Sequence, residues 1–256
     1  MRLAIMQPYF MPYIGYFQLS AAVDKYILYS HVNYSKHVWV NRNRLLTRDG
    51  TIFQATVPLK NRSSNAMISD LEIDNAQPWK AKLLRSLQVC YCRTPYYDEI
   101  YPLLADLFST EYPLLKDLNI ASIVAIVRYL GINTQIETDS SRYQLLDQQL
   151  QNIEDDYSLL PYLEKTKPHR RVARIIEMCR QEGADHFINA IGGQQLYDKE
   201  EFAQYDIRLN FIQTNPIQYR QDSKTDVFVP DLSIIDVLMN NGRDATRQLL
   251  MQYTLI

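Results

Sequence analysis

The sequence predicts an α/β fold whose core is a mostly parallel, Rossmann-like sheet. Two short apolar runs, RLAIM at residues 2–6 and KYILYS at residues 25–30, are typical of buried strands. Between them, residues 15–23 carry the apolar spacing of a helix. A strand, turn, helix and strand in succession indicate a parallel sheet. A similar unit in the second half of the chain is the third observation.

That second unit spans residues 165–213 and supplies further strands. VARIIEMCRQEG has the spacing of an amphipathic helix, with Gly183 as its C-terminal stop. ADHFINAIGG is a predicted buried strand that runs into a glycine pair, QLYDKEEFAQYD a helix, and IRLNFIQ a further strand. Because crossover connections are right-handed, we expect these strands to lie parallel in the same sheet.

The segments between the two units predict a hairpin and a helical insertion. Asp49 and Gly50 form a turn between two runs with β character, so a hairpin should leave the main layer over residues 39–59. We expect a helical insertion over about residues 78–130. Four prolines stand near the expected helix starts: Pro78, Pro95, Pro102 and Pro113.

The remaining segments complete one domain. INTQIET predicts a strand, and residues 143–163 are weakly helical. SIIDVLM and ATRQLLMQYTL predict two helices over about residues 231–256. Because we find neither an internal repeat nor a low-complexity linker, we expect a single α/β domain over residues 1–256.

Charge and composition limit the classes of partner. The chain has 256 residues, with 27 basic and 29 acidic side chains and a formal net charge of -2. Such a balance gives no long-range field for nucleic acid, so we expect no nucleic-acid partner and only a local anion site. No window nears the ~18 apolar residues of a membrane helix, and RLAIM lacks the features of a signal peptide. Three cysteines make a poor disulfide framework, which agrees with a reducing compartment. We therefore expect a cytoplasmic protein without an integral membrane segment.

The stretch QPYFMPYIGYF, residues 7–17, directly follows the first predicted strand. Ligands of open parallel sheets bind where the carboxyl ends of strands lead into helices. We therefore expect this stretch to form a pocket wall, in which tyrosine rings stack on a sugar or base. Gly15 would let an anion approach the N-terminus of the first helix. The alternative is an aromatic plug that packs this helix against the sheet.

Basic residues gather in two groups. The first has asparagines interleaved and comprises Lys36, His37, Asn41, Arg42, Asn43 and Arg44. The second begins before the helix of the second unit and comprises Lys165, Lys167, His169, Arg170, Arg171 and Arg174. Arg170 and Arg174 are four residues apart and share a helical face, which suits a pyrophosphate or carboxylate. The alternative is a solvated face.

Two residues are candidates for acid–base chemistry. His169 stands in the second basic group, and an imidazole that titrates near neutral pH can accept a proton from an attacking amine. Asp198 follows the glycine pair, although it could instead cap a helix. Cys179 with His186 is a weaker, nucleophilic pair, because Cys179 falls on an apolar helix face. No metal site is predicted, because the remaining candidates match no common zinc spacing: Cys90, Cys92, His31 and His37.

The four residues Tyr13-Ile14-Gly15-Tyr16 resemble the His-x-Gly-His motif of nucleotidylyltransferases and class I aminoacyl-tRNA synthetases. Tyrosines replace both histidines. A tyrosine can donate a hydrogen bond to a phosphate but does not carry the positive charge of an imidazolium. Nucleotidyl transfer is therefore an alternative function rather than the preferred one.

Four longer segments are spaced as in the WbqC-like protein family: IMQPYFMPYIGYFQL, VNRNRL, HFINAIGGQQLYDKEEF and LSIIDVLM. The resemblance covers about residues 4–250. Members are encoded in bacterial surface-polysaccharide clusters, particularly for O-antigen, and the resemblance implies transfer of glycine, or another small amino acid, to the amine of an amino sugar. It implies functional roles for Gln7, Pro8, Tyr13, Gly15, Tyr16, Asn41, Arg42, Asn189, Gly192, Gly193, Tyr197, Ser233 and Asp236.

We therefore expect a transferase that adds an aminoacyl or acyl group to the amine of a nucleotide-linked amino sugar. The aromatic turn from Tyr9 to Tyr16 would contact the sugar or base. Arg42, Arg170 and Arg174 would hold the pyrophosphate. Asn189 and the backbone of Gly192 and Gly193 would orient the acyl donor or its developing oxyanion. His169 or Asp198 would accept the amine proton.

No cofactor is expected beyond an activated acyl or aminoacyl donor. The expected partners are the small-molecule substrate and other enzymes of the pathway. A competing class is a non-catalytic module that binds the sugar nucleotide, or a partner enzyme, with the same aromatic pocket.

Overall fold

The computed structural model describes residues 1–256 apart from 36–38, 61–65, 152–156, 159, 165 and 226. In that part of the chain, a six-stranded sheet has the order β5-β2-β1-β6-β7-β8. Its strands are β1 (Arg2–Met6), β2 (Lys25–Leu28), β5 (Gln135–Glu137), β6 (His186–Ala190), β7 (Arg208–Thr214) and β8 (Tyr253–Leu255). All neighbouring pairs are parallel except β7 and β8. The predicted mostly parallel, Rossmann-like sheet is thus confirmed.

The strand order creates a switch point beside β1. From β1 the chain moves outward to β2 and then β5, and later returns to the other side of β1 to form β6 and β7. Connections therefore leave the carboxyl ends of β1 and β6 in opposite directions. In open α/β sheets, ligands bind in the crevice that this reversal leaves.

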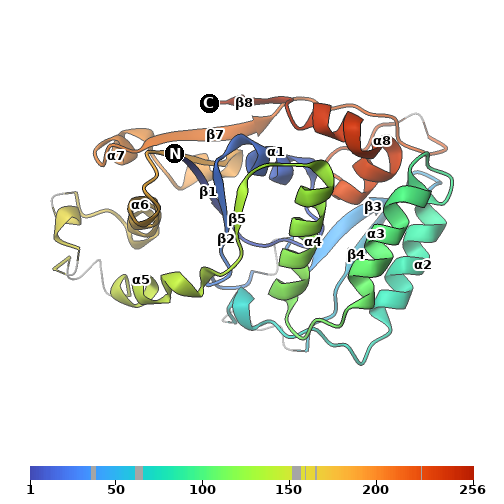
Figure 1. Ribbon diagram of the computed structural model, residues 1–256, viewed down its shortest axis with the longest axis horizontal. Coiled ribbons are helices and arrows are strands. Elements are labelled where there is room, and N and C mark those ends of the chain that lie inside the picture. The colour runs from blue at the N-terminus through green and yellow to red at the C-terminus, as the bar shows by residue number, and fades with distance from the viewer. Residues whose placement is uncertain (36–38, 61–65, 152–156, 159, 165, 226) are drawn as a thin grey trace.

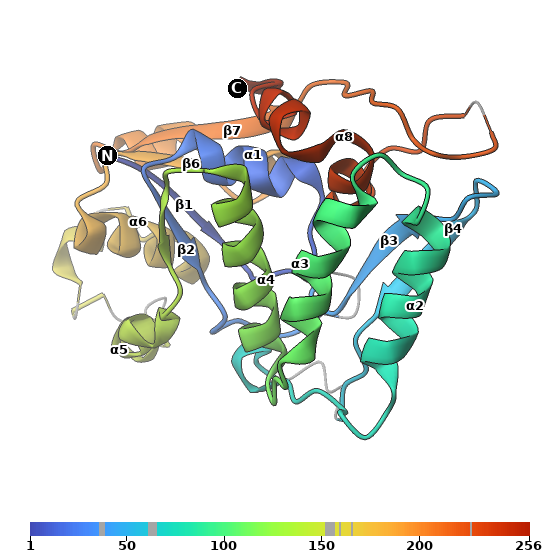
Figure 2. The same cartoon turned by 45° about the vertical axis from the view of Figure 1, so that its right-hand side comes forward.

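Helices cover both faces of the sheet (Figures 1 and 2). One layer contains α1 (Ile14–Ala22), α4 (Leu115–Leu130) and α8 (Ile234–Leu249), and the other contains α5 (Gln144–Gln149), α6 (Arg170–Glu182) and α7 (Lys199–Ala203). Side chains alternate between the layers along each strand. Ala4 and Ile188 pack in the first core, whereas Leu3, Ile5 and Phe187 pack in the second.

The sequence explains where the best-defined helix begins and ends. The ring of His169 caps α6 by accepting a hydrogen bond from the backbone N–H of Arg171. Gly183 ends the helix in a left-handed conformation with φ of 66°. A left-handed residue at this position favours glycine, so the predicted stop is confirmed.

The predicted hairpin forms a sheet of its own. Strands β3 (Arg42–Leu46) and β4 (Ile52–Thr56) pair antiparallel, with Leu46 opposite Ile52. Gly50 has φ of 86° in the turn between them, which explains the glycine. The pair is hydrogen-bonded to no strand of the larger sheet in the described part of the chain.

The predicted helical insertion is confirmed as α2 (Trp79–Tyr91), α3 (Tyr97–Ser109) and α4. Pro78, Pro95 and Pro113 precede these helices, but Pro102 lies inside α3 instead of near a helix start. Its ring faces solvent, so the one main-chain hydrogen bond that a proline removes is lost at an exposed position.

The C-terminal region contains the two predicted helical segments, which form the two halves of α8. They meet at a kink at Gly242, whose backbone is not helical, with φ of 65° and ψ of -165°. The ring of Tyr96 packs there, and a Cβ on residue 242 would lie 2.4 Å from it. Residues 253–255 form β8, not helix, because they complete the hydrogen bonds of the edge strand β7.

Two further elements, a strand and a helix, are shorter than predicted. The strand expected over residues 25–30 ends at Leu28, and the helix expected over residues 195–206 is reduced to α7. A short 3-10 helix over Ile191–Gln195 and the cap at Asp198 account for the second difference. None of the helices in the described part of the chain is long and apolar enough to cross a membrane.

Candidate functional site at the carboxyl edge of the sheet

A cavity of about 830 Å³ opens where the carboxyl ends of β1, β2 and β6 meet the start of α6. We call it the arginine cavity. It is lined by Ile5, Met6, Gln7, Tyr29, His31, Val32, Asn33, Met67, Gln151, His169, Arg170, Arg171, Arg174, Ile175, Leu196 and Tyr197. The cavity thus lies beside the switch point of the sheet and brings together five predicted residues: Gln7, His169, Arg170, Arg174 and Tyr197.

The first turn of α6 makes this cavity electropositive. Helix N-termini favour acidic residues, because the backbone dipole and the unpaired N–H groups are positive there. This first turn has no acidic residue and carries Arg170 and Arg171 instead, with Arg174 one turn later. None of the described residues that line the cavity is acidic. Such an arrangement suits an anion with several oxygen acceptors, such as a phosphate or pyrophosphate.

Arg174 is held by an acidic residue outside the cavity lining. Its Nε donates to Asp147 at 2.9 Å, and the same carboxylate accepts the Tyr29 hydroxyl at 2.6 and 2.5 Å. The guanidinium carbon also lies 5.7 Å from the centre of the Tyr29 ring. Burial, and next the Asp147 carboxylate, hold the pKa of Tyr29 above its usual range, so its hydroxyl stays a donor. The Arg174 charge is therefore partly compensated and its position is fixed.

Arg171 is an arginine of this cavity that the sequence prediction did not select. It is exposed, it lies in the first turn of α6, and it lines the cavity. Its position directly after Arg170 was the available signal, but the sequence prediction paired Arg170 with Arg174 because of their four-residue spacing.

Gln7 supplies a buried acceptor at the end of β1. Its side-chain oxygen is shielded from solvent and accepts no hydrogen bond from the described part of the chain. A buried oxygen without a donor costs about 1–3 kcal/mol, so a donor from a bound ligand would relieve that cost. Across the cavity, the Tyr197 ring is fixed by edge contacts with Phe187 and Phe202, at centroid distances of 6.2 and 5.8 Å.

Most of the opening stretch lies in the core, not along the cavity. Phe10 and Met11 are fully buried. The Asn43 amide donates to both of their carbonyl oxygens, at 3.0 and 2.6 Å, and Asn119 donates to that of Pro8 at 2.9 Å. Ser233 adds a donor to the Met11 carbonyl at 2.8 Å. The structure therefore favours the alternative of an aromatic plug held through its backbone.

The tyrosines of this stretch do not line the cavity either. Tyr16 is buried and its hydroxyl donates to the carbonyl oxygen of Gln7 at 2.8 Å. Tyr9 packs 5.9 Å from the Tyr16 ring, and Tyr13 precedes α1. A Cβ at Gly15 would lie 2.4 Å from the Tyr13 ring, so close packing of that ring explains the glycine without a ligand. The likeness to His-x-Gly-His gains no support, because the second tyrosine is enclosed.

The described residues of the first basic group lie in β3 of the hairpin or directly before it, outside the cavity lining. The guanidinium carbons of Arg42 and Arg44 lie 5.6 and 5.5 Å from the centre of the Trp39 ring. Asn41 donates to the carbonyl oxygen of Val57 at 3.0 Å and is buried. Lys36 and His37, with Lys165 of the second group, lie outside the described residues.

In the loop after β6, the predicted polar side chains form hydrogen bonds with the backbone of neighbouring residues. The side-chain oxygen of Asn189 accepts from the backbone N–H of Ala190 at 2.9 Å, and its amide nitrogen lies 2.4 Å from where a Cβ of Gly193 would be. Gly192 faces open space. Asp198 caps α7, with its carboxylate accepting from Glu200 and Glu201 backbone N–H groups at 2.8 and 3.0 Å. These four predicted residues do not line the arginine cavity: Asn189, Gly192, Gly193 and Asp198.

His31 lines the arginine cavity and was considered from the sequence only as a metal ligand. Its Nδ1 lies 3.0 Å from the Ser140 hydroxyl and its Nε2 lies 3.0 Å from the Gln144 amide nitrogen. Its place directly after a predicted strand was the signal that could have identified it. Among the described residues, no three His, Cys, Asp or Glu side chains form a group that could hold a metal ion.

The other candidate groups are fixed inside the fold. Cys179 is buried, and burial raises the pKa of its thiol to about 12, so it is not a thiolate nucleophile. His186 hydrogen-bonds with the Asn210 side-chain oxygen at 2.9 Å. Ser233 caps α8, and Asp236 is buried where it accepts the hydroxyls of Tyr219 and Tyr91 at 2.7 and 3.0 Å.

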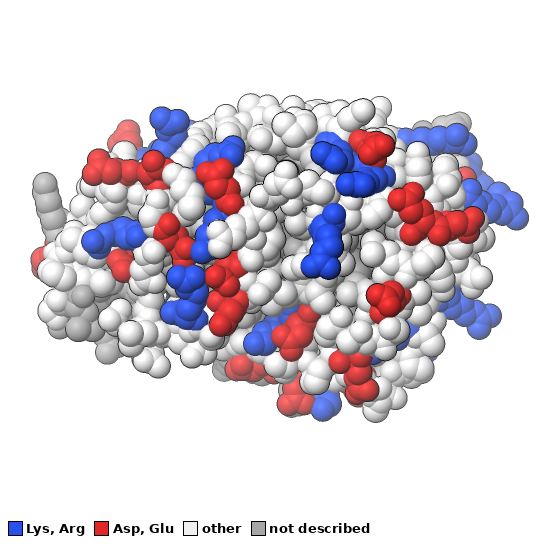
Figure 3. All heavy atoms as spheres, viewed as in Figure 1, with Lys and Arg blue, Asp and Glu red and all other residues white. Residues whose placement is uncertain are grey.

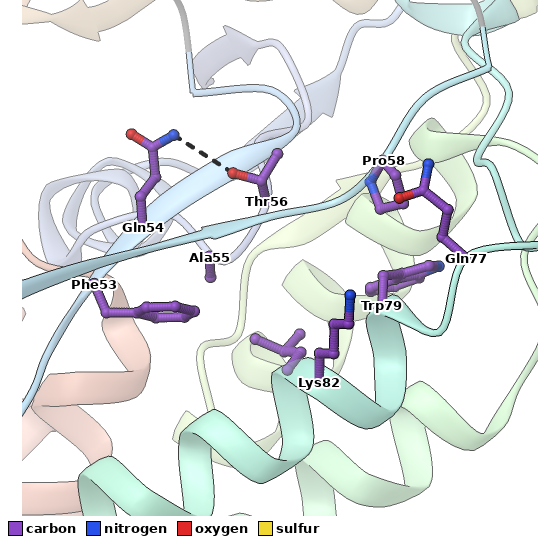
Figure 4. Close-up of a pocket in the computed structure, with 9 residues that line it drawn as sticks. Phe53, Gln54, Ala55, Thr56, Pro58, Gln77, Trp79 and Lys82 are labelled. Atoms are coloured by element: carbon purple, nitrogen blue, oxygen red, sulfur yellow. Dashed lines mark hydrogen bonds between the residues drawn. The ribbon is translucent and has the colours of Figure 1, made fainter.

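A smaller cavity of about 280 Å³ lies between β4 of the hairpin and the start of α2 (Figure 4). Phe53 faces it from the hairpin, and Trp79 and Lys82 face it from the helix. Its lining contains none of the predicted site residues. We therefore take the arginine cavity as the candidate functional site.

Comparison with known proteins agrees with the extent of the sequence resemblance. The model of the WbqC-like protein family matches residues 7–248. The uncharacterized protein Rv1507c of Mycobacterium tuberculosis is 28% identical over 247 residues, which cover 95% of each chain. No solved structure matches the chain.

Proposed function

Because the chain belongs to the WbqC-like protein family, we propose that it acts in bacterial surface-polysaccharide biosynthesis, particularly of O-antigen. Its substrate in this proposal is a nucleotide-linked amino sugar. The reaction transfers glycine, or another acyl group, from an activated donor to the amine of that sugar.

One observation carries the proposal: the arginine cavity combines the positive end of a 13-residue helix with three arginines, beside the switch point of a parallel sheet. A sugar nucleotide presents a diphosphate, which bears the charge and the paired oxygens that guanidinium groups bind best. The side-chain oxygen of Gln7, which accepts no hydrogen bond from the residues that the structure describes, and the ring of Tyr197 add polar and apolar contacts for the rest of the ligand.

The proposed chemical step is an acyl transfer. The amine nitrogen attacks the acyl carbonyl carbon and forms a C–N bond, while the bond from that carbon to the donor's leaving group breaks. The leaving group departs with the bonding electrons, and the amine loses a proton to a base. We assign this base to His169, because it lines the cavity whereas Asp198 does not. The proton would go to Nδ1, the ring nitrogen that accepts the Arg171 backbone N–H, so this cap hydrogen bond would break in the step.

Binding tests the proposal directly. We expect one class among UDP-, dTDP- and GDP-linked amino sugars to raise the melting temperature of the protein, since a ligand that binds only the native state stabilises it. Arg171→Gln should reduce the affinity at least tenfold, because it removes a charge from the cavity. Arg180→Gln, at the other end of α6, is the matched control. Equal affinities of the two variants would contradict the proposal.

A non-catalytic binding module is a second candidate, and one observation favours it: both predicted catalytic residues cap helices. Turnover separates the two. An enzyme with His169 as base should lose at least a hundredfold in kcat in His169→Asn, with the affinity for the sugar nucleotide changed less than threefold. Retention of normal glycan output by cells that carry His169→Asn would instead favour the module.

A further inference from the structure

A second cavity, of about 460 Å³, continues the arginine cavity along the carboxyl edge of the sheet. Its walls come from the residues that follow β2 and β5 and from the start of α4. His31 and Met67 line both cavities, so they form the boundary between the two. A ligand that lies along this edge would therefore pass from one cavity into the other at His31.

The lining of this second cavity differs in chemistry from that of the first. Five hydroxyl groups line it, so we call it the hydroxyl cavity: Ser30, Ser69, Thr138, Ser140 and Ser141. It also contains two carboxylates, Asp70 and Asp139, and one lysine, Lys116. The arginine cavity has three arginines and no acidic residue among its described lining. The character of the edge thus changes from cationic to hydroxylated and acidic over a single boundary.

The boundary is held in place by a chain of hydrogen bonds. Ser30 and Ser140 are only 2% and 3% exposed, and their hydroxyl oxygens lie 3.0 Å apart. The backbone N–H of Ser30 also donates to the Ser140 hydroxyl at 3.2 Å, and His31 contacts that hydroxyl at 3.0 Å. The Gln144 amide nitrogen lies 3.0 Å from the other ring nitrogen of His31, Nε2. Buried hydroxyls fixed in this way present a preorganised polar wall to a ligand.

We propose that the hydroxyl cavity is the subsite for the amine-bearing sugar ring, and that the arginine cavity holds the diphosphate of the same ligand. This inference rests on the proposed function of the arginine cavity. A sugar ring carries several hydroxyls, each of which can donate and accept, and these match the serine and threonine hydroxyls. An ammonium group on the ring pairs with Asp70 and Asp139.

The same charges fix the direction in which the ligand lies. Two carboxylates outweigh the single lysine in the hydroxyl cavity, so this cavity disfavours a phosphate, whereas the three arginines of the other cavity would repel an ammonium group. A ligand with a diphosphate at one end and an amine on its sugar therefore has one favourable orientation. His31, at the boundary, would contact the sugar near its bond to phosphate.

Calorimetric titration of the full chain with three small probes tests this subsite without knowledge of the nucleoside. Pyrophosphate reports on the arginine cavity alone. Glucosamine 1-phosphate adds an amine-bearing sugar, and glucose 1-phosphate is the matched sugar without the amine. We expect the wild-type protein to bind pyrophosphate, and to bind glucosamine 1-phosphate at least fivefold more tightly than glucose 1-phosphate.

Variants assign this preference to residues. The double variant Asp70→Asn with Asp139→Asn should weaken binding of glucosamine 1-phosphate about tenfold and change the affinity for pyrophosphate less than twofold. Both carboxylates are exposed, and asparagine retains the capping oxygen at residue 139, so the fold should persist. Asp117→Asn is the matched control, because Asp117 lies near the start of α4 but outside the cavity lining.

The outcomes separate the two proposals. If pyrophosphate fails to bind, the proposed function of the arginine cavity is wrong, and the inference falls with it. If pyrophosphate binds but the double variant keeps the wild-type affinity for glucosamine 1-phosphate, only the sugar subsite is overturned. Ser140→Ala gives a second readout, since loss of the buried hydroxyl should weaken both sugar phosphates and leave pyrophosphate unaffected.

Discussion

Asp236 is a carboxyl group enclosed between α8, α2 and the segment that precedes α8. Its two oxygens accept hydrogen bonds from Tyr219 and Tyr91, and Gln221 approaches one of them at 3.4 Å. Burial raises the pKa of this carboxyl from 3.8 to about 6, and the hydrogen bonds oppose the rise without cancelling it. The folded protein therefore holds the proton more tightly than the unfolded chain does.

A pH-dependent stability follows from this residue. Because the folded-state pKa is raised, its contribution to stability is fully present below pH 3.8 and is lost as the pH rises through about 6. In urea unfolding, we expect the free energy of unfolding of the wild type, minus that of Asp236→Asn, to fall by about 2 kcal/mol between pH 4 and pH 7. Other titrating groups cancel in that difference. Parallel curves for the two proteins would show that Asp236 does not carry the effect.

At the scale of elements, the sequence best predicted the strands and helices that a local pattern of apolar residues defines. The strands β1, β6 and β7 and the helix α6 were identified from apolar spacing, and Gly183 from the left-handed conformation that a helix stop favours. β8 could not be identified in this way, because its pairing with β7 depends on an edge that only the folded sheet provides.

In the candidate site too, residues placed by local sequence patterns were predicted, whereas contacts between residues distant in sequence were not. The predicted topology placed Gln7 and Tyr197 at the carboxyl edge, and the helical spacing placed Arg170 and Arg174 on one face of α6. The opening stretch was expected at a ligand because its aromatic composition is unusual. Its environment depends on Asn43 and Asn119, which are distant in sequence and whose side-chain amides donate hydrogen bonds to its carbonyl oxygens. No local sequence pattern reveals such partners. The sequence alone therefore could not decide whether residues 7–17 pack in the core or bind a ligand.

At the scale of the whole molecule, the two signs of charge nearly balance, with a formal net charge of -2. On the face that Figure 3 shows, basic and acidic side chains are interspersed. Exposed charges more than about 8 Å apart are largely screened at physiological salt. An anion at the carboxyl edge should therefore respond to the arginines around it and not to basic residues elsewhere.

Charge reversal at two places tests how local this effect is. Arg171→Glu should abolish measurable binding of pyrophosphate at 0.15 M salt, because it adds a negative charge beside the anion. Lys80→Glu makes the same change of charge on α2, which lies at the opposite end of the molecule from α6 (Figure 1). We expect it to change the affinity less than twofold at 0.15 M salt, since screening removes its field at that distance. A comparable loss in both variants would mean that the overall charge of the molecule, and not the arginine cavity, attracts the anion.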